Sequence, residues 1–318
     1  LCGCWLALHS AGSWFDTPDY DNNPGPRRYS HDPLARQLAA SNNSFGIDVW
    51  RALEADDGNL TISPASLYMG LSMARLGARG QTATELEQVL YATGSGDALH
   101  QAIHGQLRAW NSPSRGPRQL SMANRLFGDR SYNFAPEFVR ETKELYRTEL
   151  EEVNFRKKPD RSRERINDWI AEQTRDRLRE TLPPGSVTSS TRLALTNVAY
   201  FKGRWATPFE EEVTIAEPFY PSPDESFEVW TMHQIEPLWY GETETLQVLE
   251  LPYQGSHMAM LVILPKELDG LADLERELDV ELLDVVTENM THGEVRVALP
   301  RFRVATEAPL DLSSLLGD

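Results

Sequence analysis

TRLALTNVAYFKGRW, residues 191–205, is the stretch of sequence that decides the fold. Its apolar side chains occupy both alternating faces of an extended chain, with Leu195 and Phe201 on one face and Val198 on the other. Such a strand is covered on both sides, so the pattern favours the centre of a sheet over a half-exposed position. The amide of Asn197 would then be buried, and a buried amide without partners costs about 1–3 kcal/mol. We therefore expect another segment of the chain to bond to Asn197.

The segment over 59–78, NLTISPASLYMGLSMARLGA, is the candidate for that role. Ser63 is a suitable N-cap, and Pro64 suits the first position of a helix. The helix that follows is apolar nearly all round, which predicts a buried helix. We expect small Gly70 and Ala74 to let another backbone come close, and we expect the helix to begin near the strand described above.

Several segments in this order resemble the serpin family. They are NLTISPAS at 59–66, GARGQT at 77–82 and TNVAYFKGRW at 196–205. Further along the chain, LELPY at 249–253, MLVILP at 260–265 and LPRF at 299–302 resemble serpin strand segments in the expected sequence. The resemblance covers about residues 45–318, which is nearly the whole chain.

The resemblance implies an α+β fold with a large central mixed β-sheet, further smaller sheets and about eight helices in a single domain. Residues 1–12 are interpreted as the remnant of an export signal, 13–32 as a flexible lead-in and 33–318 as the serpin domain. A charged helix over 160–180 has one apolar stripe, with which it would lie across the front of the main sheet. The sequence stops at Asp318, where a late helix would begin, so we expect the final strands and the reactive-site loop to be missing from it.

The resemblance also implies a function. Serpins are mostly suicide-substrate inhibitors of serine proteases, and sometimes of cysteine proteases, so the chain would be an inhibitor and not an enzyme. The cleaved loop inserts into a metastable central sheet and carries the acylated protease with it. Two alternatives stay open, namely a non-inhibitory serpin that acts as a carrier or chaperone, and an inactive truncated serpin. The reactive bond, which would set the target protease, is not identified in this sequence.

Five residues match positions of functional interest in the family. Ser63, Ser66 and Asn197 match the shutter, a hydrogen-bonded cluster where the main sheet opens. Trp205 matches the tryptophan of the breach, where strand insertion starts. Arg301 matches a basic position of the breach that would pair with an acidic residue of the loop hinge. The competing interpretations are a helix cap with a satisfied amide for the first three residues and a large core anchor for Trp205.

Composition bounds the remaining possibilities. The 318 residues are 40% hydrophobic and carry a net charge of −17, which disfavours nonspecific binding of nucleic acid. No apolar run is long enough for a membrane-spanning helix. The sequence has no G-x-S-x-G elbow, no glycine-rich phosphate loop and no paired cysteine metal site. We therefore expect a monomer without cofactor or metal, whose partner is a serine protease.

The cysteines bear on localisation. Cys2 and Cys4 lie within LCGCWLAL, residues 1–8, which resembles the end of an export signal, and small residues at 10–12 would suit cleavage. A second interpretation is a lipoprotein box with a lipid anchor at Cys4, and a third is a segment without a role. The first two interpretations predict a secreted, extracellular or periplasmic protein.

Two further patterns could suggest a metal site and a polyanion site, but the residues favour neither. His100 and His104 are four residues apart on a predicted helix, but Gln101 stands where an HExxH zinc motif needs glutamate. We expect both histidines to lie on a solvated helix face. The basic residues between 156 and 179 alternate with acidic ones, so their fields cancel and no polyanion site is expected.

Overall fold

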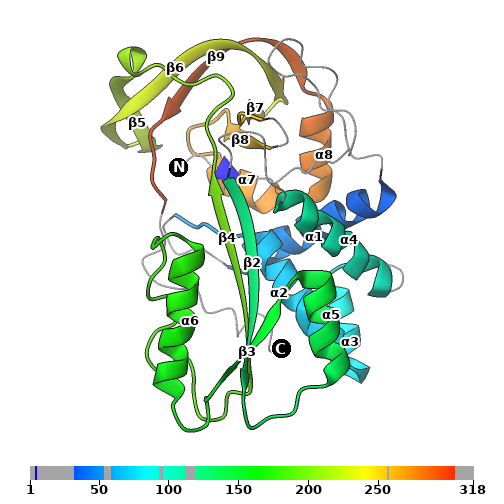
Figure 1. The fold of residues 1–318 in the computed structure, drawn as a ribbon. Helices are drawn as coiled ribbons and strands as arrows, with labels where there is room; N and C mark the ends of the chain where they lie inside the picture. The colour runs from blue at the N-terminus through cyan, green and yellow to red at the C-terminus, as the bar shows by residue number, and fades with distance from the viewer. Residues whose placement is uncertain are drawn as a thin grey trace.

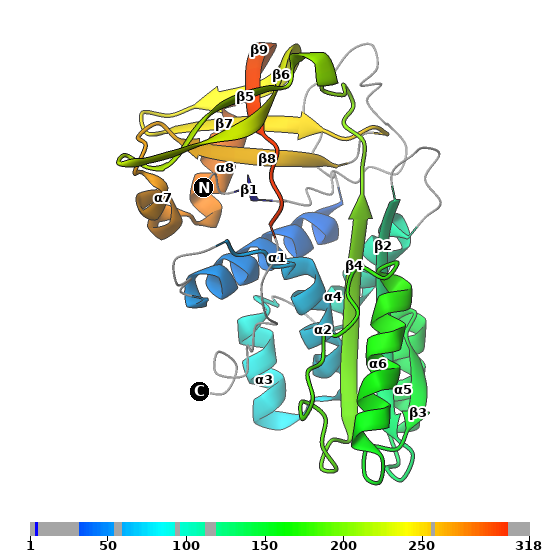
Figure 2. The ribbon, with the colours of Figure 1, turned by 90° about the vertical axis from the view of Figure 1, so that its left-hand side faces the viewer.

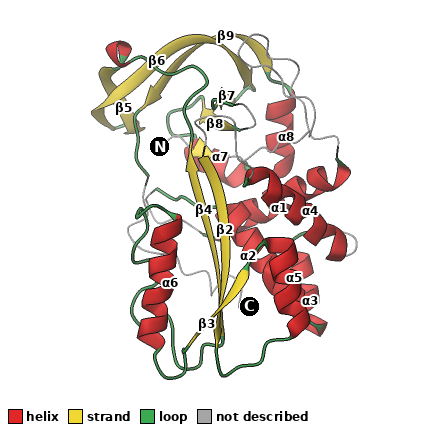
Figure 3. Cartoon of the chain, viewed as in Figure 1, coloured by secondary structure: helices red, strands yellow, loops and turns green. Residues whose placement is uncertain are grey.

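The computed structural model describes residues 4–5, 32–53, 59–92, 96–111, 119–255 and 258–304. These residues form eight α-helices and two β-sheets, one of three strands and one of six. Figure 1 shows the three-stranded sheet upright in the middle and part of the six-stranded sheet arching over the top. The α+β architecture predicted from the sequence is confirmed, and Figure 3 shows how its helices and strands interleave.

Five helices form a group on one side of the three-stranded sheet (Figures 1 and 2). They are α1 (Pro33–Ala52), α2 (Pro64–Gly77), α3 (Gly80–Val89), α4 (Gly96–Trp110) and α5 (Pro136–Tyr146). Helix α2 is the buried helix that the sequence predicts, and Tyr68, Met69 and Met73 place it in the core of this group. Pro64 occupies the first turn of α2, where its missing N–H costs no hydrogen bond.

The three-stranded sheet has the order β3-β2-β4. Its strands are β2 (Gln119–Asp129), β3 (Glu149–Val153) and β4 (Leu193–Lys202). Strand β2 is parallel to β3 and antiparallel to β4, so the sheet is mixed, and Asn124 lies opposite Asn197 in the register.

Helix α6 (Pro159–Gln173) packs its apolar stripe of Ile166, Trp169 and Ile170 on one face of this sheet, as predicted. The helix ends before the predicted Glu180. Arg175 and Asp176 have φ values of 53° and 62°, and such left-handed backbone cannot continue an α-helix.

Strand β4 is covered on both faces, which confirms the interpretation of its pattern. Val198 packs in the cluster that contains α6, and Leu195 packs against the cluster of α2 on the other face. Its position differs from the prediction, since β4 is the edge strand among the described strands of its sheet and not a central one. The apolar pattern of β4 depends on the helices that cover its two faces. It does not depend on how many strands pair with β4 at its edges.

The six-stranded sheet has the order β1-β8-β7-β6-β5, and β9 also pairs with β6. Its strands are β1 (Cys4–Trp5), β5 (Ile215–Ser222), β6 (Glu225–Glu242), β7 (Leu246–Pro252), β8 (Ala259–Pro265) and β9 (Thr291–Pro300). A short 3-10 helix, η1 (Glu211–Val213), precedes β5. Helices α7 (Leu271–Glu277) and α8 (Val280–Glu288) contribute apolar side chains to a core shared with β7 and β8.

Most of the predicted N-terminal segments lie outside the described residues. Of residues 1–12 the structure describes only Cys4–Trp5, which pair antiparallel with Leu261 and Val262 of β8. Of the predicted lead-in over 13–32, only Asp32 is described, and it caps α1 by accepting a hydrogen bond from the Leu34 amide at 3.0 Å. In the part of the chain that is described, no helix is long and apolar enough to cross a membrane.

Candidate functional site

The start of α2 holds the two serines that the sequence singles out. Ser63 is the N-cap residue, but its hydroxyl donates to the hydroxyl of Ser66 at 3.0 Å and accepts no hydrogen bond from a backbone amide of the helix. A Cβ on Gly46 of α1 would lie 2.8 Å from the Cβ of Pro64, so the absence of a side chain at Gly46 lets the two helices meet here. The close approach expected at Gly70 is wrong, since no described atom lies within 4 Å of a Cβ built there.

Asn197 lies between β2 and α2. Its Nδ2 donates to Oδ1 of Asn124 on the neighbouring strand, and the same nitrogen is 4.0 Å from the sulfur of Met69. Its Oδ1 is buried and has no hydrogen-bond partner among the described residues. A buried acceptor in this state costs about 1–3 kcal/mol. Among the described residues, Asn197 therefore holds an unsatisfied acceptor on the edge strand of the sheet.

The structure brings the predicted shutter residues to one contact between a helix and a strand, but in two separate hydrogen-bonded pairs. Met69, which touches Asn197, lies one turn after Ser66 on α2. No hydrogen bond joins Asn197 to Ser63 or Ser66 in the described part of the chain. Their shared role in the opening of the sheet stays a prediction.

Asn124 is the partner of Asn197 that sequence reasoning missed. The side chain of Asn124 is buried, and its Nδ2 donates to the Tyr146 carbonyl at 3.3 Å. Thr148 also donates to this carbonyl, at 3.2 Å. A signal was present in the sequence, because Asn124 is an amide between apolar Met122 and Leu126, just as Asn197 is an amide within an apolar strand.

The polar network continues from Tyr146 to α4. The Tyr146 hydroxyl lies 2.6 Å from Nδ1 of His100, whose exposed fraction is 5%. The prediction of a solvated face is therefore wrong for His100, because α5 covers it. His104 donates from Nδ1 to the Leu145 carbonyl at 3.1 Å. Burial raises the pKa of Tyr146 well above its usual value, so its phenol stays neutral in this network.

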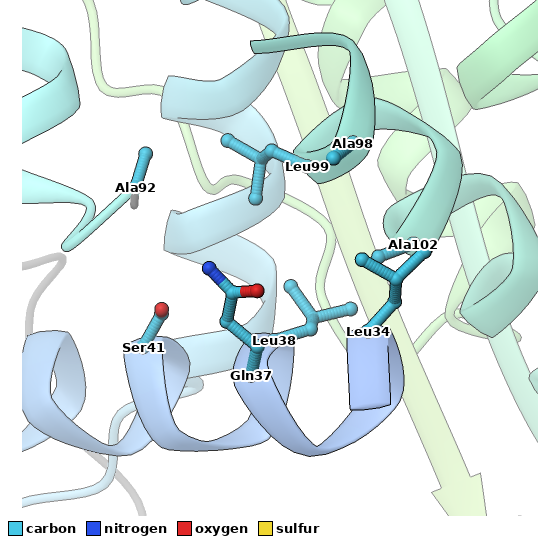
Figure 4. A pocket seen from close by; sticks show the side chains of 8 residues that line it. All are labelled: Leu34, Gln37, Leu38, Ser41, Ala92, Ala98, Leu99 and Ala102. Atoms are coloured by element: carbon cyan, nitrogen blue, oxygen red, sulfur yellow. The ribbon is translucent and has the colours of Figure 1, made fainter. Parts of the chain in front are cut away.

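A small cavity lies between α1 and α4, with a volume of about 20 Å³ (Figure 4). It is lined by small and apolar side chains that include Leu34, Leu38, Ala98, Leu99 and Ala102, together with the polar Gln37 and Ser41. Its volume is close to that of one water molecule measured in the same way. Nearby, burial raises the pKa of Tyr68 to about 12, an effect opposed by a hydrogen bond with Ser41. The cavity is too small for a larger ligand.

A wider groove on the surface lies along α4 and α5, with a volume of about 590 Å³. Its lining residues are His104, Arg108, Lys143, Glu144, Arg147 and Glu149. The Nζ of Lys143 is 3.9 Å from a carboxylate oxygen of Glu149. The groove is thus lined by both cations and carboxylates.

Trp205 joins the end of β4 to the six-stranded sheet. Its ring stacks on that of Tyr253, with centroids 4.6 Å apart and planes at 10°, and it meets the ring of Phe209 edge-on at 6.2 Å. Gly203 permits this packing, because a Cβ there would lie 2.7 Å from atoms of Phe201 and Tyr253. This geometry fits a core anchor at the junction of the sheets, and the breach role of Trp205 stays a prediction.

Arg301 follows directly after β9. Its amide donates to the Trp230 carbonyl at 2.8 Å and so extends the pairing of β9 with β6. Its side chain is exposed and makes no ion pair with any described residue. The predicted partner for Arg301, an acidic hinge residue, is not among the described residues.

The described residues contain no group of three or more His, Cys, Asp or Glu side chains that could hold a metal ion. The candidate site is built from the side chains of α2, β2 and β4 described above. It consists of an edge strand between two helix layers, a buried amide pair and a serine pair at the start of α2.

Comparison with known proteins relates this geometry to one family. The model of the family "Serpin (serine protease inhibitor)" matches residues 40–318. Leukocyte elastase inhibitor from Equus caballus is 37% identical over 294 residues, which are 88% of this chain and 76% of that protein. Human Serpin B3 is 34% identical over 299 residues, again 88% of this chain and 76% of that protein.

Solved structures agree with these matches. Ovalbumin from emu (Dromaius novaehollandiae) superposes with a TM-score of 0.84 at 31% identity, covering 88% of this chain and 76% of that one. A cleaved Serpin 42Da superposes with a TM-score of 0.82 at 28% identity, covering 89% and 76% of the two chains.

Proposed function

The chain belongs to the serpin family, and we propose that it inhibits a serine protease by acting as its suicide substrate. In this mechanism the protease supplies the nucleophile and acylates itself on a reactive-site loop. The cleaved loop then enters the sheet of β2, β3 and β4 as a new strand and carries the protease with it. The chain is accordingly an inhibitor and not an enzyme.

The main support for this proposal is the position of β4, which is covered on both faces and paired on one edge among the described strands. Its two faces are covered by α6 and α2, one edge pairs with β2, and the other edge is unpaired among the described strands. An unpaired edge presents a row of backbone donors and acceptors to which another strand can bond. The buried Oδ1 of Asn197 lies on this same strand and accepts no hydrogen bond from a described residue. A strand added beside β4 would bond to the backbone groups of this edge, as the mechanism requires.

The proposal assigns each candidate residue a role in the opening of the sheet. As the sheet opens, β4 shifts relative to α2, and the contact between Asn197 and Met69 must adjust while the Ser63–Ser66 pair holds the start of the helix. Trp205, at the junction of the two sheets, stands where opening would begin. Arg301 would attract an acidic residue of the loop hinge, because its exposed guanidinium has no carboxylate partner in the described residues.

A non-inhibitory serpin is the second candidate function, and the similarity to emu ovalbumin favours it. A carrier or chaperone would use the same fold without trapping a protease. An inactive chain is the third candidate.

The test is formation of a covalent complex. The full-length protein is incubated with trypsin, subtilisin and leukocyte elastase, and the products are separated in SDS. The proposal predicts an SDS-resistant complex with at least one enzyme and none when the catalytic serine is blocked beforehand. Cleavage without a complex would assign the chain to the non-inhibitory class, and neither cleavage nor complex would favour the inactive one.

We also propose that the protein is exported, which the apolar segment over 1–8 and the small residues at 10–12 support. Recovery of the protein from the medium or the periplasm, with a new N-terminus after residue 12, would agree with cleavage of a signal. Labelling by palmitate that is lost in Cys4→Ser would instead identify a lipid anchor. Retention of residues 1–12 in a cytosolic protein would contradict both versions. A monomer is expected in solution.

A further inference from the structure

Three stretches of the sequence match the acceptor pattern for N-linked sugars, which is asparagine, any residue except proline, and then serine or threonine. They are NNS at 42–44, NLT at 59–61 and NMT at 289–291. The inhibitory mechanism makes no use of them. An N-linked sugar is bulky and needs space on the surface, so the fold decides which of the three stretches can carry one.

The first two stretches are less suited to a sugar. Asn42 and Ser44 lie within α1 and are both half-buried, next to Phe45 in the core of the helix group. Asn59 is exposed, but it follows directly after residues 54–58, which lie outside the described part of the chain. The surroundings of Asn59 are thus described on one side only.

The third stretch forms the turn between α8 and β9. Asn289 is the C-cap residue of α8, Thr291 is the first residue of β9, and both are exposed. Met290 between them has an exposed fraction of 5%. It packs against Gly241 of β6, where an added Cβ would lie 3.1 Å from the Cγ of Met290. Met290 thus anchors the turn from inside, while the two side chains that define the acceptor pattern lie at the surface.

The surface around Asn289 has space for a sugar. Glu288 and residues 291–294 are exposed as well, and no described atom lies within 4 Å of a Cβ built on Gly293. The Nδ2 of Asn289 donates to the Val285 carbonyl at 2.7 Å. A sugar replaces only one of the two hydrogens on this nitrogen, so the other can still donate to the end of the helix. The Val285 side chain is apolar and 45% exposed, and a sugar one turn away would shield it from water.

We propose that Asn289 is an N-glycosylation site, which places an oligosaccharide on the turn between α8 and β9. In the reaction, Nδ2 of Asn289 forms a bond to the anomeric carbon of an oligosaccharide carried on a lipid pyrophosphate. The bond from that carbon to the pyrophosphate oxygen breaks, the lipid pyrophosphate leaves with the bonding electrons, and one Nδ2 proton is released. The sugar donor and its transferase belong to the export pathway, so this inference rests on the proposed export of the protein.

The site lies away from the edge where the loop would insert. Figures 1 and 2 show α8 beside the six-stranded sheet and α6, which covers one face of β4, at the other end of the molecule. The apolar side of α8 belongs to the core shared with β7 and β8. We therefore expect the sugar to raise the solubility of the protein and to leave the rate of SDS-resistant complex formation unchanged.

The test uses the full-length protein secreted by a eukaryotic cell line from its own export signal. Peptide N-glycosidase F removes the sugar and converts the modified asparagine to aspartate, which tandem mass spectrometry locates. We expect this conversion at residue 289 and a faster migration of the whole protein in SDS after the treatment. A secreted protein with unmodified Asn289 would overturn the glycosylation site and leave the proposed export intact.

Variants separate the acceptor pattern from the helix cap. Thr291→Ala leaves the bond from Asn289 to the Val285 carbonyl in place, but it should abolish the modification of residue 289. Thr291→Ser keeps a hydroxyl at this position and should retain the sugar. Asn59→Gln is the matched control, because it removes a different acceptor and should leave residue 289 modified. A sugar that persists on Asn289 in Thr291→Ala would contradict N-linked transfer to this stretch.

The shielding of Val285 is tested in the unmodified protein. Thr291→Ala is expected to precipitate at a lower concentration than the glycosylated protein, and a second change, Val285→Ser, is expected to restore part of the loss. Equal solubility of the glycosylated and unmodified proteins would overturn the shielding. An unchanged melting temperature of both variants would show that the fold is intact.

The outcomes distinguish this site from the proposed function. A sugar on Asn289 of a secreted protein that forms no SDS-resistant complex would keep the glycosylation site and overturn the inhibitory function. An unmodified protein retained in the cytosol would overturn the glycosylation site together with the proposed export.

Discussion

The two sheets of this serpin differ in what they bury, since one packs against polar groups and the other encloses apolar side chains. The three-stranded sheet packs over a chain of buried polar groups, from Asn197 through Asn124 to Tyr146 and His100. In the described part of the chain, it ends at the edge strand β4, where Oδ1 of Asn197 has no hydrogen-bond partner. The six-stranded sheet encloses clusters of apolar side chains. Buried polar networks fix one arrangement when satisfied and are costly when partly satisfied. We infer that the first sheet is the part that rearranges and the second is the frame against which it moves.

The largest expected effect lies in the frame. Ile263 of β8 has an exposed fraction of 2% and packs between β7 and helices α7 and α8, so Ile263→Ala should cost about 2–5 kcal/mol of unfolding free energy. Denaturant unfolding measures this cost. Leu264→Ala, one residue along and 38% exposed, is the control and should cost less than about 1 kcal/mol. Equal losses of unfolding free energy in the two variants would contradict the burial of Ile263 in the core beside α7 and α8.

The next effect tests the polar network. Asn124→Ala removes the acceptor of Asn197 and a donor to the Tyr146 carbonyl, and we expect a loss of about 1–3 kcal/mol. A double-mutant cycle with Asn197→Ala should give a coupling energy of about 1 kcal/mol. Ser121→Ala, at an exposed position of the same strand, should be nearly neutral. A coupling energy near zero would show that Asn124 and Asn197 do not stabilise each other, and the contrast between a polar and an apolar sheet would then be wrong.

A pH-dependent effect of smaller size is expected at the end of β2. The Ser131 hydroxyl, together with backbone amides of Arg156 and Ser131, lowers the pKa of Asp129 to about 2. Because the folded pKa lies below the unfolded value of 3.8, this contribution is present above pH 4 and is lost as the pH falls from about 4 to about 2. Asp129→Asn should cost about 1–2 kcal/mol at pH 7 and flatten the dependence of stability on pH in that range. An unchanged acid profile would contradict this role for Asp129.

The smallest effect concerns the attachment of α6 to the sheet. Glu151 of β3 accepts hydrogen bonds from Arg125 of β2 and Arg165 of α6, each at 2.7 Å. All three side chains are partly exposed, so Arg165→Gln should cost less than about 1 kcal/mol, and less still in high salt. Arg179→Gln, at the exposed pair with Asp176, serves as a reference. A loss above 2 kcal/mol would show that charge, and not the apolar stripe of α6, attaches the helix.

The sequence predicts well what depends on local pattern. Alternation along 193–202 predicts cover on both faces, Pro64 predicts the start of α2, and the stripe of Ile166 and Trp169 predicts how α6 packs. These features follow from the periodicity of a single element. The α+β fold was predicted on other grounds, from the order of segments that resemble the serpin family.

Features that depend on distant segments could not be predicted. The edge position of β4 depends on which strands lie beside it, and the pairing of Asn197 with Asn124 joins residues 73 positions apart. His100 is buried because α5 covers it, which the pattern of α4 does not encode.

Hydrogen–deuterium exchange across β4 tests the central claim most directly. The full-length protein is measured over residues 193–202 before and after reaction with a protease that forms the SDS-resistant complex. If the loop inserts beside β4, amide exchange in this strand should slow markedly, while exchange in β7 and β8 stays unchanged. Unaltered exchange in β4 after complex formation would contradict strand insertion at this edge.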